Sequence, residues 1–100
     1  MKNLQLKIHY ELEQYESAIS IIDTYKHFLA KNTLISESRK LLHYNFVSYT
    51  NKLIQYISGS KKINLLFLSE KVLMSKNIFD KNWIMEKIYE QTHKYKGVAS

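Results

Sequence analysis

Residues 15–31 read YESAISIIDTYKHFLAK, and this stretch decides the fold. Its apolar residues recur at the i, i+3, i+4, i+7 spacing of an α-helix, and they form two neighbouring rows. The two rows are Tyr15, Ala18, Ile19, Ile22, Lys26 and Leu29, with the aliphatic stem of the lysine as filler, and Ile21, Tyr25 and Phe28. A helix that is apolar on two sides needs cover on both, so we expect it to lie centrally in a helical domain.

The preceding segment predicts a first, shorter helix. Leu4, Ile8 and Leu12 lie four residues apart within residues 2–12, which places them on one face of a helix. Residues 13–14 then form a tight turn into the central stretch. The two helices are therefore expected to form an antiparallel hairpin.

The rest of the chain predicts three more helices, over residues 36 to about 57, 61 to about 76 and 80 to about 93. Their apolar rows are Leu42, Phe46, Tyr49, Leu53 and Tyr56; Leu65, Leu66, Leu68, Val72 and Leu73; and Trp83, Ile84, Ile88 and Tyr89. We expect the tail from Lys94 to be frayed. The fold class is therefore all-α, with about five antiparallel helices in stacked helical hairpins, as in an α-solenoid. A closed helical bundle is the alternative.

Polar residues mark the expected ends of these helices. Asn32 is placed as the C-cap of the second helix, and Ser36 as the N-cap of the third. Ser58-Gly59-Ser60 is the small-residue turn that ends the third helix, and Asp80 is the expected N-cap of the fifth.

The composition agrees with helices and narrows the function. Proline and cysteine are absent and glycine occurs twice, so turn-rich sheets, disulfides, thiolate nucleophiles and cysteine-based zinc sites are not expected. The longest apolar run, residues 65–68, is far shorter than a membrane span of about 20 residues, and the N-terminal residues lack a signal peptide's apolar core. We expect a cytoplasmic protein that does not bind a membrane.

The sequence offers no convergent set of chemical groups. His9 and Glu13, like Asp23 and His27, are one helical turn apart, but zinc needs three or four ligands. No glycine-rich loop is available to hold a phosphate. We therefore expect no catalytic residue, no metal and no cofactor, and the chain is not predicted to be an enzyme.

The net charge of +6 is unevenly distributed. Residues 1–33 hold four lysines and four acids, so residues 34–100 carry 11 of the 15 basic groups and 5 of the 9 acidic ones. Such an excess can bind phosphates, and Lys87, Tyr89, Lys94 and Tyr95 are where bases would stack. Fourteen of the fifteen basic residues are lysine, however, whereas arginine is the usual choice for specific recognition. A solvated surface is therefore the favoured interpretation.

One cluster near the start of the third helix is the best candidate for contact with a partner. It consists of Arg39, Lys40, His43 and Tyr44. Tyrosine is common both at the margin of a core and at recognition surfaces, and Tyr44 has basic neighbours on the same helix.

The segment Tyr15-Glu16-Ser17-Ala18 resembles the start of the second helix in tetratricopeptide-like helical repeats, where the alanine allows close helix approach. The chain is also similar to the closing segment of bacterial helical-repeat proteins whose function is not assigned. The matching stretches are Tyr10-Glu11-Leu12, Tyr15-Glu16, Ile22-Asp23, His27-Phe28-Leu29, Asn32, Ser36-Glu37 and Trp83 to Ile88. This resemblance implies that residues 1–100 are a single helical domain and a fragment or end-piece of a longer repeat protein. Glu13 stands where the repeat has glycine, proline is missing, and the period of about 34 residues is not kept.

The expected function is a non-catalytic scaffold for protein–protein interaction. The partner would be another protein, further repeats of the same chain, or a second copy that covers apolar surface on the first helix. The alternative is a basic nucleic-acid-binding domain that uses residues 34–100.

Overall fold

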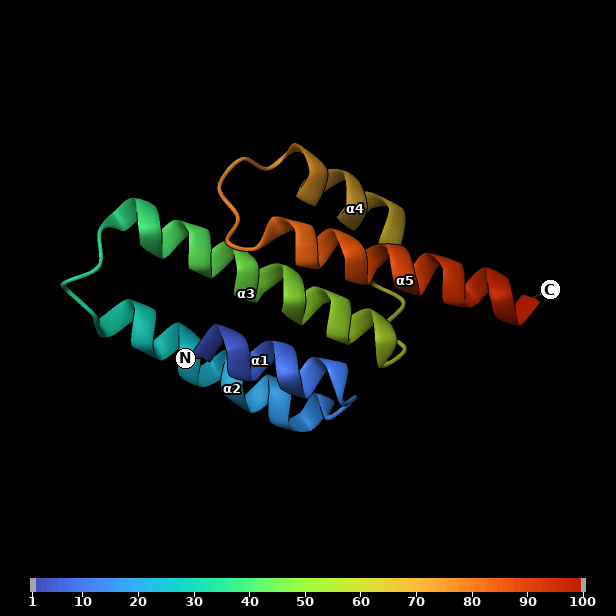
Figure 1. The fold of residues 1–100 in the computed structure, drawn as a ribbon, viewed down its shortest axis with the longest axis horizontal. Coiled ribbons are helices and arrows are strands. Elements are labelled where there is room, and N and C mark those ends of the chain that lie inside the picture. The colour runs from blue at the N-terminus through green and yellow to red at the C-terminus, as the bar shows by residue number, and fades with distance from the viewer. Residues whose placement is uncertain (1, 100) are drawn as a thin grey trace.

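The computed structural model describes the backbone of residues 2–99 and the side chains of residues 2–93. The all-α prediction is confirmed, because the described residues contain five helices and no strand (Figure 1). The helices are α1 (Lys2–Glu11), α2 (Tyr15–Lys31), α3 (Glu37–Ile57), α4 (Leu65–Met74) and α5 (Lys81–Ala99). None of them is long and apolar enough to cross a membrane.

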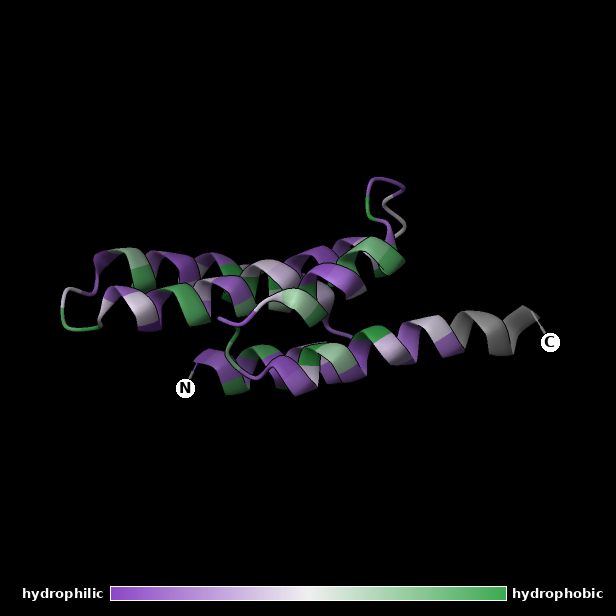
Figure 2. Ribbon diagram, turned by 90° about the horizontal axis from the view of Figure 1, so that it is seen from above, coloured by the Kyte–Doolittle hydropathy of each residue, from purple (hydrophilic) through white to green (hydrophobic). Residues whose placement is uncertain are grey.

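Helix α3, rather than α2, lies at the centre of the molecule. It packs against α2, α4 and α5, whereas α2 packs against α1 and α3. In Figure 2 the N-terminal end of α1 lies in the same layer as α5, with the α2–α3 pair in the other layer. The expectation of a central α2 was wrong because parts of both its apolar rows, at Ile19 and Phe28, remain exposed.

The core is built around aromatic rings that meet on α3. Phe46 is fully buried, and its ring centroid lies 6.5 Å from that of Tyr25, 5.6 Å from that of Phe79 and 5.9 Å from that of Trp83. Ala18 is also fully buried, in the α2 face that packs into the core. One residue of α3 therefore connects α2, α5 and the segment that precedes α5.

Side chains join the first helix to the last. The ring of Tyr10 packs edge-on against Trp83 at 5.2 Å, and Lys7 forms an ion pair with Asp80. The ammonium group of Lys87 lies 2.8 Å from the carboxylate of Glu11 and 3.1 Å from that of Glu90. Burial lowers the pKa of Lys87, but the hydrogen bonds to both carboxylates outweigh it and raise the pKa overall, so this buried lysine stays charged.

Three predicted helix ends are confirmed. Asn32 is the C-cap of α2, and the hydroxyl of Ser36 accepts a hydrogen bond from the Arg39 N–H at the start of α3. Helix α3 ends at Ile57, and Gly59 follows with φ of 98°, a conformation that glycine adopts without strain.

The ends of α4 and α5 differ from the prediction. Helix α4 begins at residue 65 rather than 61, because the side chain of Asn64 caps it by accepting from the Phe67 N–H at 3.1 Å. Asp80 directly precedes α5, but its carboxylate binds Lys7, and its backbone carbonyl accepts hydrogen bonds from the N–H groups of Trp83 and Ile84. The backbone of α5 continues to Ala99, so the expected end near residue 93 was wrong; the side chains from Lys94 on lie outside the described residues.

Candidate functional site

The predicted partner-binding cluster lies at the start of α3, and the structure divides it between two sides of the helix. His43 is half-buried and points toward α2, where its Nδ1 lies 2.5 Å from the hydroxyl of Tyr25. Its ring stacks on Phe79 with centroids 4.5 Å apart. The imidazole therefore belongs to the packing between α2, α3 and the segment before α5.

Lys40 and Tyr44 line an open groove of about 570 Å³ between α2 and α3. The ammonium group of Lys26 lies 5.6 Å from the centroid of the Tyr44 ring, and that of Lys40 lies 3.7 Å from the carboxylate of Glu37. Tyr44 is half-exposed and Arg39 is exposed, but Arg39 does not line this groove. Two of the four predicted residues thus share one groove, and the other two lie elsewhere.

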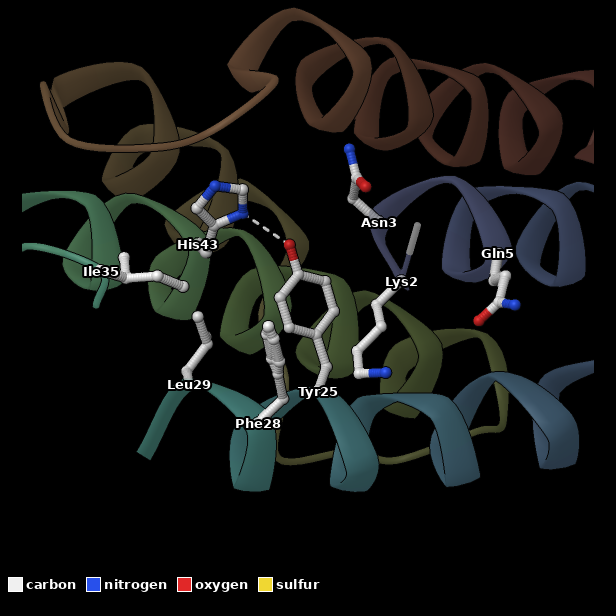
Figure 3. Close-up of a pocket in the computed structure, with 8 residues that line it drawn as sticks. All are labelled: Lys2, Asn3, Gln5, Tyr25, Phe28, Leu29, Ile35 and His43. Carbon is white, nitrogen blue, oxygen red and sulfur yellow. Dashed lines mark hydrogen bonds between the residues drawn. The ribbon is translucent and has the colours of Figure 1, made fainter. Parts of the chain in front are cut away.

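The Tyr25–His43 pair borders a cavity of about 360 Å³ (Figure 3). Burial, with a smaller contribution from the charge of Arg39, lowers the pKa of His43, and burial raises the pKa of Tyr25 to about 12. At neutral pH the tyrosine hydroxyl therefore keeps its proton and shares a hydrogen bond with Nδ1 of the neutral imidazole. Among the residues that the structure describes, no carboxylate lines this cavity, and the hydrogen bond between the pair joins α2 to α3.

The histidine–acid pairs seen in the sequence do not converge. The His27 and Asp23 side chains approach to 3.8 Å on the exposed side of α2, and His9 shares a 2.7 Å hydrogen bond with Gln14. Among the described residues, no three histidine or acidic side chains gather where they could hold one metal ion.

The outer face of α4 carries four exposed apolar side chains. Leu66 is 70% exposed, Phe67 58%, Leu73 62% and Met74 80%, whereas Leu68 and Val72 face the core. Leu66 and Leu73 belong to the apolar row expected for this helix, and the sequence did not predict that these two residues face outward. The sequence did contain one signal for this outward face. Apolar residues occur all round this short helix, and such a helix is expected to be covered by other elements or molecules on every side. We call these four side chains the α4 outer face.

Helix α1 has a second exposed apolar row. Leu6 and Tyr10 are buried, and Leu4, Ile8 and Leu12 are 53%, 47% and 61% exposed. The spacing predicted the shared face of these three residues correctly. We call them the α1 outer row.

The basic residues of the second half separate into buried and exposed groups. Lys87 is buried between Glu11 and Glu90, so it is not available to a nucleic acid, although Tyr89 beside it is exposed and stacks on His93. Between α3 and α4, the residues that line a groove of about 260 Å³ include Lys52, Lys62, Phe67 and Lys71. The Lys71 ammonium group lies 5.2 Å from the centroid of the Phe67 ring.

Comparison with known proteins gave no match: no protein-family model, no curated protein and no solved structure is significantly similar to this chain. The geometry of the described residues is therefore what supports a function.

Proposed function

We propose that this chain is a non-catalytic protein-interaction scaffold, and that the α4 outer face is its main binding surface. The exposure of Leu66, Phe67, Leu73 and Met74 on one ten-residue helix carries this proposal. The partner is another protein, or further tetratricopeptide-like hairpins of the same polypeptide, with a complementary apolar face.

The physical argument is the free energy available from covering this face. Burial of apolar surface contributes about 25 cal/mol per Å², so four large side chains that leave water together supply several kcal/mol. Contiguous exposed apolar side chains are also uncommon on proteins that bind nothing. The methionine and the phenylalanine suit a protein interface, since aromatic residues and methionine are enriched there.

A pair of matched variants tests this proposal. The double variant Leu66→Ser/Leu73→Ser removes two side chains of the α4 outer face, whereas Leu34→Ser removes an even more exposed leucine from the loop before α3. We expect affinity purification from the producing cells to recover a protein with the wild type and with Leu34→Ser, but not with the double variant. Recovery of the same proteins with all three chains would contradict the proposal.

The lysine-lined groove beside α4 favours nucleic-acid binding as a second candidate. Lys52, Lys62 and Lys71 surround it, and Phe67 offers an exposed ring on which a base can stack. A single strand would bind with its phosphates on the lysines.

Fluorescence anisotropy of a labelled single strand tests the second candidate. Counterion release requires the affinity to fall steeply between about 50 and 200 mM salt, roughly tenfold or more for three phosphate contacts. Lys52→Glu/Lys62→Glu should abolish such binding. Absence of binding to the wild type at low salt would contradict it, and would leave the scaffold proposal unaffected.

A further inference from the structure

The groove between α3 and α4 combines an apolar base with a basic rim. Leu68 is buried and Ile63 is half-buried at its base, and the 58% exposed ring of Phe67 forms one wall. The lysines that line its rim are all exposed, and they are Lys52, Lys62 and Lys71. We call the groove lined by these residues the lysine groove. Its base suits an apolar group, and its rim suits anions.

The charges of the three rim lysines are not neutralised within the described part of the chain. None of them forms an ion pair there, whereas Lys87 is paired with two carboxylates. The ammonium group of Lys71 lies 5.2 Å from the centroid of the Phe67 ring, and that of Lys52 lies 5.8 Å from that of Tyr49. Such contacts hold an ammonium group in place, but they do not cancel its charge.

No acidic residue lines the lysine groove among the residues that the structure describes. Glu70 is exposed on the same helix, but it is not part of the lining. Three positive charges therefore surround one opening, and their mutual repulsion is relieved when a negative group enters between them. Charge complementarity identifies the occupant as acidic.

The volume of the lysine groove fits one large side chain. The groove measures about 260 Å³, and a protein cavity of about 150 Å³ already accepts a benzene ring. A phenol or indole ring therefore fits into it and can stack on the exposed ring of Phe67. The occupant thus combines an aromatic ring with negative groups on either side.

The continuity of the groove with the α4 outer face favours a protein over a nucleic acid. Phe67 belongs to both surfaces, and Met74, which is 80% exposed, lies about two turns further along the same side of α4. A polypeptide can place carboxylates on the lysines and apolar side chains on Met74. A single strand carries a charge at every nucleotide and has only its base faces to cover such a side chain.

We infer that the lysine groove binds an acidic segment of a partner protein, with a large aromatic side chain between its carboxylates. The inference rests on the proposed function, because it names the chemistry of the partner that the α4 outer face binds. Exposed ion pairs each contribute little to affinity. The segment alone therefore binds weakly, with a Kd on the order of 0.1–1 mM at low salt.

Titration of the full chain with synthetic peptides, followed through its backbone amide signals in NMR spectra, tests the inference. The acidic probe is Glu-Glu-Trp-Glu-Glu with blocked termini, and Gln-Gln-Trp-Gln-Gln is its neutral counterpart. We expect the acidic probe to shift the signals of Lys62, Phe67 and Lys71, and to bind roughly fivefold more tightly than the neutral probe. Raising the salt from about 50 to about 200 mM should weaken the acidic probe alone.

Substitutions at the rim and the wall provide matched variants. Lys62→Glu should weaken the acidic probe roughly fivefold or more, whereas Lys62→Arg keeps the charge and should bind it like the wild type. Lys31→Glu makes the same charge change at an exposed lysine of α2, outside the groove, and should have no effect. Phe67→Ala should weaken both probes, because it removes the ring on which the indole stacks. Circular dichroism should show all chains equally helical.

Several results would overturn the inference. Equal affinities for the two probes would do so, and so would a Lys62→Glu chain that binds the acidic probe like the wild type. Absence of shifts at the groove with about 5 mM peptide would also do so, since this concentration exceeds the expected Kd. Tighter binding of an oligothymidine strand than of the acidic probe would identify the occupant as a nucleic acid instead.

The test separates this inference from the proposed function. The Leu66→Ser/Leu73→Ser variant should still bind the acidic probe, because neither of these described side chains lines the groove. If that variant loses its protein partner while the wild type ignores the probe, the scaffold proposal stands and the inference fails. If the probe binds while all chains recover the same proteins, the α4 outer face is not the binding surface.

Discussion

Helices α3 and α4 both carry large apolar side chains, but they use these side chains in different ways. Along α3, the fully buried residues are Phe46, Val47, Thr50, Leu53 and Ile54, and the helix packs against three others. Helix α4 packs against α3 and α5 through Leu68 and Val72, and the α4 outer face remains in contact with water.

The difference separates residues that hold the fold from residues that are free to bind. In α3, each large apolar side chain that faces the core removes surface from water within the chain itself. In α4, the outer side chains gain nothing comparable from the fold. The apolar character of a helix therefore predicts that it will be covered, but not which molecule covers it.

The largest expected effect on the free energy of unfolding is found by comparing the substitution of one phenylalanine in each helix. Phe46→Ala should destabilise the fold by about 3–5 kcal/mol, because it leaves a cavity among the rings of Tyr25, Phe79 and Trp83. Phe67→Ala should change stability by less than about 1 kcal/mol, since its ring is mostly exposed. Urea denaturation measures both values. Equal losses for the two variants would contradict the division between α3 and α4.

A smaller effect is expected at the C-terminal end of α4. The ammonium group of Lys81 donates to the backbone carbonyls of Leu73 at 2.6 Å and Ser75 at 2.8 Å. Lys81→Met should destabilise the fold by about 1 kcal/mol and increase the hydrogen exchange of α4 amides. Lys76→Met, at an exposed lysine in the same connection, is the control and should have no effect. If α3 amides exchange faster as well, the two helices do not unfold separately.

A weaker, pH-dependent effect is expected at His43. Burial, followed by the nearby Arg39, lowers its pKa from 6.5 in the folded state, so below that pH the unfolded chain binds a proton that the folded chain does not. Stability from this group is complete above pH 6.5 and declines as the pH falls toward the folded pKa. His43→Gln should remove this part of the acid sensitivity, and His27→Gln, at an exposed position, should not. Denaturation curves recorded between pH 7.5 and pH 5 give the free energy of unfolding at each pH. Identical slopes of this free energy against pH for the wild type and His43→Gln would show that His43 does not contribute.

The smallest change in stability is expected on the α4 outer face. Leu73→Ser should alter the free energy of unfolding by no more than about 0.5 kcal/mol, because the leucine is 62% exposed in the free chain. Calorimetry of the isolated chain is the measurement. A loss of several kcal/mol would mean that this side chain belongs to the core.

Much of the fold followed from the sequence, because helical spacing and caps are local signals. The spacing of Leu4, Ile8 and Leu12 identified one face of α1, and Ser36 and Gly59 marked real helix ends. The direction in which a face points is not local. In α1, the buried residues are Leu6 and Tyr10, and only the position of the neighbouring helices decides this.

The candidate site was harder to predict for the same reason. Arg39 and His43 form one row on α3, and Lys40 and Tyr44 form a second row that is rotated from the first by about 100°. Only the positions of the neighbouring helices decide that His43 lines the Tyr25 cavity and that Lys40 and Tyr44 line the open groove. The role of Lys87 depends on Glu11, 76 residues away. The α4 outer face was missed because Leu66 and Leu73 look the same in a sequence whether they face the core or the solvent.

The most direct test of the central claim is site-specific photo-crosslinking from the α4 outer face. A benzophenone side chain at position 67 replaces an exposed ring of α4, and the same group at position 55 replaces the exposed Gln55 on α3 as a control. After illumination of the producing cells, we predict discrete protein adducts from position 67 and none of them from position 55. Adducts with nucleic acid alone, or the same adducts from both positions, would contradict the claim that this face binds a protein.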